Sequence, residues 1–210
     1  MLKYICLLGC LAFALNSCGG EGNENQTSED SSEGSLSEAV SAVSSLSNMA
    51  DEVQDAEKNY KKLTSLTPLT NDQLKAWMPE KLMAMKRTAY SIGGGYLSTT
   101  SLHATYSKKD KPEEIKIQLM DGADSIAASV ISLFRISLAR DFEQETQSHV
   151  KKTVEKDGVK AIEKYQKDSS RSTITFVYDE RYYVELIGTN IYITQLWDAV
   201  NQLNLDDLGE

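Results

Sequence analysis

The sequence predicts an α+β fold: a mainly antiparallel sheet with helices packed on one face, preceded by a long amphipathic helix and a disordered tether. Near the C-terminus, four segments with apolar residues at alternate positions follow one another, and short turn sequences separate them. Consecutive strands joined by tight turns pair side by side, so these segments form an antiparallel sheet. The four segments are 150–155, 159–166, 172–178 and 181–187.

Earlier segments extend the same pattern. Alternation over 87–92, 102–106 and 115–119 predicts three more strands. The first two of these flank Gly93-Gly94-Gly95, which is typical of a flexible hairpin because no Lys-Ser or Lys-Thr follows, as a phosphate-binding loop would require.

Three further helices are expected: one before the strands, one between the two groups of strands and one after them. Thr70-Asn71-Asp72-Gln73 is typical of a helix N-terminus, and Pro79 ends that helix. The segment from Ile126 to Leu138 predicts a buried central helix. Its buried face is expected to hold Ile126, Val130, Leu133, Phe134 and Ser137, widened by Ile131 and Leu138. A last helix is expected over 194–203.

A long amphipathic helix is expected over 36–66, ahead of the globular domain at 67–210. Ser35 begins its capping box, and its apolar stripe is thin in Leu and rich in Val and Ala. This composition favours docking on the domain, and pairing with a second helix as a short coiled coil is the alternative. The stripe consists of Leu36, Val40, Val43, Leu46, Ala50, Val53, Ala56, Tyr60 and Leu63.

Composition limits the classes of function. The 210 residues carry 22 Lys and Arg against 31 Asp and Glu, a formal net charge of -9. With 40% hydrophobic residues, the chain can build an ordinary globular core. We expect no nucleic-acid partner, because a net-acidic chain without a basic cluster repels phosphate.

The N-terminus has the features of a secretory signal peptide at 1–17. Lys3 precedes an apolar segment from Ile5 to Leu15 of roughly eleven residues, too short to span a bilayer. It ends in Leu15-Asn16-Ser17-Cys18, which resembles the lipobox of bacterial lipoproteins. An ordinary cleaved signal is the alternative.

The resemblance implies that Cys18 becomes the lipidated N-terminus, carrying a diacylglyceryl group and an amide-linked palmitate-type chain. Several acyl chains anchor a protein firmly. It therefore implies an envelope protein attached to a membrane, and we favour the outer membrane, with the periplasmic or surface side left open. Cys6 and Cys10 would leave with the signal, and residues 19–210 contain no cysteine.

Residues 18–35 are expected to form the lipidated cysteine and an acidic tether. The tether has no basic side chain and includes Glu21, Glu24, Glu29, Asp30 and Glu33. Low hydrophobicity with like charges predicts a disordered segment. Its acidic character also resembles the signal that sends some lipoproteins to the cell surface, and a plain solubilising spacer is the alternative.

Few residues suggest catalysis. His103 and His149 lie far apart in the sequence and lack metal-ligand spacing, so we expect strand histidines, no metal and no cofactor. Asp121 and Asp124 precede the central helix, where capping by Asp121 or Gly122 is favoured over a cation site.

Tyr182 and Tyr183 are the candidate surface contacts. Adjacent strand residues point to opposite faces, so one of the two is expected to face solvent, where it could contact a sugar or a protein. Cross-strand packing is the alternative.

The favoured hypothesis is a lipid-anchored, non-catalytic binding or assembly protein whose partner is an unidentified envelope protein or glycan. A periplasmic or surface hydrolase and a stalk that oligomerises through helix 36–63 are the alternatives.

Overall fold

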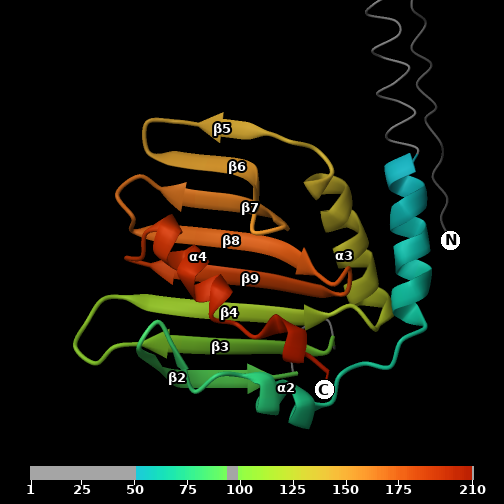
Figure 1. The fold of residues 1–210 in the computed structure, drawn as a ribbon, viewed down its shortest axis with the longest axis horizontal. Coiled ribbons are helices and arrows are strands. Elements are labelled where there is room, and N and C mark those ends of the chain that lie inside the picture. Colours follow the sequence, from blue (N-terminus) through green and yellow to red (C-terminus); the bar gives the residue numbers. More distant parts are fainter. Residues whose placement is uncertain (1–50, 94–98, 210) are drawn as a thin grey trace, which may run out of the picture. The chain divides into compact units, whose positions relative to one another are not determined.

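A nine-stranded antiparallel sheet forms the centre of the computed structural model, which describes residues 51–93 and 99–209 (Figure 1). The strand order is β1-β2-β3-β4-β9-β8-β7-β6-β5, and every neighbouring pair is antiparallel. The strands are β1 (Lys81–Leu82), β2 (Met85–Ile92), β3 (Ser101–Ser107), β4 (Glu114–Asp121), β5 (Glu143–Glu145), β6 (His149–Lys156), β7 (Val159–Gln166), β8 (Arg171–Tyr178) and β9 (Tyr182–Thr189). The predicted α+β class is confirmed.

Two meanders meet in the middle of the sheet. Strands β1 to β4 form one and β5 to β9 the other, and β4 pairs with β9 from Glu114↔Thr189 to Asp121↔Tyr182. Helix α3 (Ser125–Leu138) connects β4 to β5, which lies at the far edge (Figure 1). Because this long connection carries the chain to the far edge, the strands from β5 onward run back towards the centre, where β9 pairs with β4.

The larger core lies on one face of the sheet, under α2 (Asn71–Trp77), α4 (Ile193–Asn201) and the short 3₁₀ helix η1 (Leu205–Asp207). Alternate residues of the central strands point into it, and Trp197 and Leu196 of α4 pack on them. The fully buried strand residues include Leu102, Tyr106, Ile115, Ile117, Leu119, Ile174, Phe176, Val184 and Leu186.

A second, smaller core lies on the opposite face. Leu63 of the helix at residues 51–64 packs with Ala128 and Ile131 of α3, and these contact Met120 and Tyr183 of the sheet. The prediction that helices cover only one face is therefore wrong. At this end the outward-facing strand residues are themselves apolar, which gives a second helical layer a surface to bury.

Helix α3 is a surface helix, which corrects the prediction of a buried central one. Leu133 is 68% exposed and Ile126 43% exposed, although both were expected on the buried face. The buried residues are Ala127, Ala128, Ile131, Ser132 and Leu138, so the expected burial is confirmed only for Ile131 and Leu138. The small alanine side chains let the helix approach its neighbours closely.

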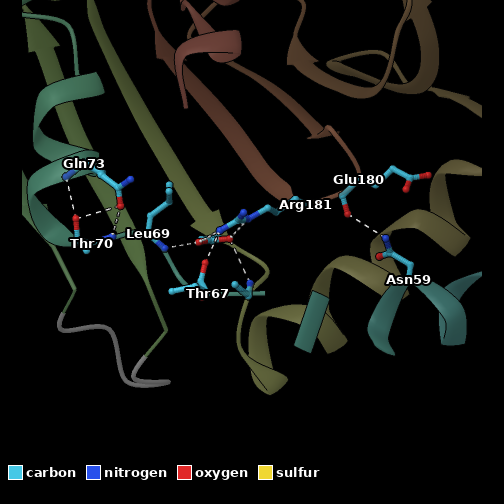
Figure 2. Close-up of polar contacts among 9 residues, drawn as sticks. Asn59, Thr67, Leu69, Thr70, Gln73, Glu180 and Arg181 are labelled. Atoms are coloured by element: carbon cyan, nitrogen blue, oxygen red, sulfur yellow. Dashed lines mark hydrogen bonds and ion pairs between the residues drawn. The ribbon is translucent and has the colours of Figure 1, made fainter. Parts of the chain in front are cut away.

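Local sequence signals are otherwise well reproduced. The capping box of α2 is confirmed, with Gln73 N donating to Thr70 Oγ1 at 3.2 Å and Thr70 N donating to Gln73 Oε1 at 3.0 Å (Figure 2). The turns at Asp157-Gly158 and Asp179-Glu180 have positive φ at both residues. Strands β1 and β5 and helix η1 were not predicted. The expected start of helix 36–66 and the signal and tether lie outside the described residues.

A buried ion pair joins the two central strands. Asp121 ends β4 with its side chain fully buried, and Arg181 immediately precedes β9. Arg181 Nε donates to Asp121 Oδ1 at 2.7 Å and Arg181 Nη2 donates to Oδ2 at 2.8 Å. The two-pronged geometry is the strongest arrangement available to an Arg–carboxylate pair.

The same pair holds the segment that connects helix 51–64 to α2. Arg181 Nη2 also donates to the carbonyl of Thr67 at 2.9 Å, and the Leu69 amide donates to Asp121 Oδ2 at 2.7 Å (Figure 2). We call the set Thr67, Leu69, Asp121 and Arg181 the clasp.

Glu180, next to the clasp, contacts both helices of the second core. Its carbonyl accepts from Asn59 Nδ2 at 3.2 Å (Figure 2). Its carboxylate forms ion pairs with Lys62 at 3.1 Å and Arg135 at 3.1 Å. The hydrogen bond from Lys62 and then that from Arg135 lower the pKa of Glu180 below its ordinary value, despite its partial burial. Helix 51–64 is thus fixed by polar contacts as well as by Leu63.

We expect Asp121→Asn to lower the free energy of unfolding by about 3 kcal/mol, because it leaves the largely buried Arg181 charge without its partner. Urea denaturation followed by circular dichroism measures the change. Asp110→Asn is the matched control: Asp110 is exposed in the β3–β4 turn, and its positive φ suits Asn. A loss for Asp121→Asn no larger than that of the control would contradict the role given to the clasp.

Candidate functional site

A pocket of about 360 Å³ opens on the second face of the sheet, over β6 to β9. Ile162, Thr173 and Thr175 contribute to its lining, and Phe134 of α3 is the one helical residue there. Strand alternation explains most of the lining, because residues between these, such as Ala161, Ile174 and Phe176, point into the larger core. Tyr165 of β7 is the exception, since it lines the pocket together with both of its neighbours.

Three cationic side chains line the pocket: Lys151 of β6, Lys164 of β7 and Arg171 of β8. Lys151 and Lys164 are direct cross-strand partners, and Lys164 is also opposite Thr173. Among the described residues, no carboxylate lies within ion-pair distance of any of the three. Lys151 Nζ lies over the ring of Phe142, 5.2 Å from the ring centroid.

One carboxylate, that of Glu185, also lines the pocket. Glu185 is half-buried, and this burial raises the pKa of its carboxyl, while Arg171 acts in the opposite direction. The site therefore combines three cations with one partly desolvated acid.

An aromatic pair forms the wall beside α3. The rings of Phe134 and Tyr183 meet edge to face, with centroids 5.3 Å apart and planes at 77°. Burial, followed by the nearby charge of Glu185, raises the pKa of Tyr183 to about 12. The Tyr183 hydroxyl thus keeps its proton at neutral pH and can donate a hydrogen bond.

The two candidate tyrosines have different surroundings. Their side chains point to opposite faces, as predicted, but Tyr182 is 4% exposed within the larger core. Tyr182 is therefore not a surface contact, because core residues of the α2 and α4 face cover it. Tyr183 is half-buried and lines the pocket, where its role in contacting a ligand stays a prediction. Cys18 lies outside the described residues.

The other candidate residues are not brought together. His103 is exposed on β3, and His149 Nδ1 lies 2.9 Å from the Thr146 hydroxyl at the start of β6. Asp124 caps α3, because its Oδ1 accepts from Ile126 N at 3.0 Å and Ala127 N at 2.9 Å. The expected cap at Asp121 or Gly122 is wrong, since Asp121 belongs to the clasp.

Neither histidine lines the pocket. Over residues 51–93 and 99–209, no three His, Cys, Asp or Glu side chains are placed to hold a metal ion. No helix in this part of the chain has both the length and the apolar character needed to cross a membrane.

Sequence reasoning missed Lys151, Lys164 and Arg171. The signal was available for the first two, since a two-residue turn at Asp157-Gly158 fixes the register of the β6–β7 hairpin and so pairs the two lysines.

Comparison with known proteins gives no relative: the chain matches no family model, no curated protein and no solved structure.

We expect Glu185→Gln to stabilise the protein at pH 7, by less than about 1 kcal/mol. Because the pKa of the Glu185 carboxyl is raised in the folded protein, folding favours its protonated form. The stability that the protonated carboxyl contributes is therefore present at low pH and is lost as the pH rises through the folded pKa. Gln has no charge to desolvate, and its advantage should therefore vanish near pH 4.

Urea unfolding at pH 4 and pH 7 tests this, with Glu143→Gln on the exposed edge strand β5 as the control. A Glu185→Gln variant that is less stable than wild type at pH 7, or equally shifted at both pH values, would contradict the effect of burial.

Proposed function

We propose that the protein is a lipid-anchored cell-envelope protein, held in the outer membrane, that presents a non-catalytic binding domain. The observation that carries the proposal is Leu15-Asn16-Ser17-Cys18 directly after a short apolar segment. Lipidation at Cys18 would supply the anchor, and the acidic residues 19–35 would hold the domain clear of the headgroups.

The pocket supports binding over hydrolysis. Its lining combines cations, hydroxyls, one carboxylate and an aromatic wall, and includes no Ser, Cys or His that could serve as a nucleophile and base pair. Cations, hydroxyls and an aromatic wall are the groups with which a binding site holds a polar ligand.

The contacts of helix 51–64 support docking over a stalk. Ala56, Asn59 and Leu63 are buried, and Leu63 packs with Ala128 and Ile131 of the same chain. Two residues of the stripe that a coiled-coil partner would need, Ala56 and Leu63, are thus buried within the chain, while Val53 is 53% exposed.

We expect Cys18→Ala to abolish incorporation of an alkyne-tagged palmitate in cells that produce the full-length chain. Cys10→Ala is the matched control, since Cys10 belongs to the signal and its loss should leave labelling unchanged. Gel fluorescence of the immunoprecipitated protein measures the label, and separation of the two membranes on a sucrose gradient locates the wild type. Label that persists on Cys18→Ala would refute the anchor.

A further inference from the structure

The pocket contains an arrangement that a sheet normally avoids. Lys151 and Lys164 are directly opposite each other on one face of β6 and β7, and like charges in such pairs destabilise a sheet. Opposite-charge pairs are the usual choice at such positions. Here Arg171 lines the same pocket, and among the described residues none of the three forms an ion pair. Glu185, the one carboxylate in the lining, interacts with Arg171 and offsets part of the positive charge, so the lining keeps an excess of cations. An anion is the partner that would relieve this repulsion.

Size and lining describe the rest of the ligand. A volume of about 360 Å³ is in the range of small-molecule pockets. Thr173 and Gln166 add neutral hydrogen-bonding groups beside the cations, and Tyr183 with Phe134 adds an aromatic wall. The hydroxyl groups of a ligand could form hydrogen bonds with the threonine hydroxyl and the glutamine amide. The apolar face of a sugar ring packs well on an aromatic side chain.

We propose that this pocket binds an acidic sugar, whose carboxylate or phosphate group is held between Lys151, Lys164 and Arg171. The inference rests on the proposed function, because it names the ligand class of the binding domain. Glu185 favours a ligand with a single anionic group, because its carboxylate repels a second negative charge placed near it.

Titration of the full-length chain in neutral detergent tests the proposal, with glucuronate and glucose 1-phosphate as probes and glucose as the uncharged control. Calorimetry at low salt measures the dissociation constants. The Kd of each anion should be at least about ten-fold lower than the Kd of glucose. Tighter glucuronate indicates a uronic acid as the natural ligand, and tighter glucose 1-phosphate indicates a sugar phosphate.

Substitutions locate the binding. Lys164→Gln and Arg171→Gln should each weaken both anions by about five-fold or more, since each removes a charge-assisted contact. Glu185→Gln should tighten both, because it removes the repelling carboxylate. Lys109→Gln, in the exposed β3–β4 turn, removes the same charge elsewhere and should change nothing. Circular dichroism confirms that each variant is folded.

The proposal is overturned if neither anion binds at about 10 mM, if glucose binds as tightly, or if the pocket variants behave like Lys109→Gln. These outcomes are separate from the palmitate experiment. If Cys18 is labelled but neither anion binds, the anchor is supported and the ligand class is wrong. If the anions bind but Cys18 is not labelled, the ligand class is supported and the anchor is wrong.

Discussion

The ion pair between Asp121 and Arg181 is the interaction on which the rest of the structure depends. One buried carboxylate accepts from Arg181 at the start of β9, from Leu69 in the segment before α2, and from the Ala123 amide before α3. A buried charge is tolerated only when its partners are all in place, so these segments must assemble together. Gly122 is part of the same constraint, since a Cβ there would lie 2.7 Å from the Arg181 carbonyl oxygen.

The clasp and the pocket are connected through α3 and β9. Arg135 of α3 pairs with Glu180 beside the clasp, and its neighbour Phe134 forms the pocket wall against Tyr183. Tyr183 also contacts the second core, in which Leu63 of helix 51–64 is buried. Displacing that helix would therefore remove support from the helix that carries the pocket wall. In an anchored protein, this arrangement would place the pocket on a domain held firmly to the helix at 51–64.

Local signals predicted most of the strands, because turn residues and alternation act over a few positions. Strand β7 has the predicted bounds, and the capping box at Thr70 forms as expected. Which face of a helix is buried depends on residues that are distant in the sequence, so local signals did not predict it. On α3, Ala127 and Ala128 are buried and Leu133 is exposed, which depends on close packing that the hydrophobicity of Leu133 did not indicate. Asp121 resembled a helix cap because its partner, Arg181, is distant in the sequence. The pairing of Lys151 with Lys164 was missed although the turn at Asp157-Gly158 fixes it, and the position of Phe134 of α3 at the same pocket had no local signal.

Native-state hydrogen exchange on the full-length chain tests most directly whether the clasp fixes helix 51–64 to the sheet. Amides are protected from exchange according to the free energy of the opening that exposes them. If the clasp fixes the helix, the amides of residues 56–64 exchange only by the same large opening as the central strands β4 and β9, with similar protection and similar sensitivity to urea. Amides in 56–64 that exchange through a much smaller opening, while β4 and β9 stay protected, would show that the helix detaches freely and would contradict the account.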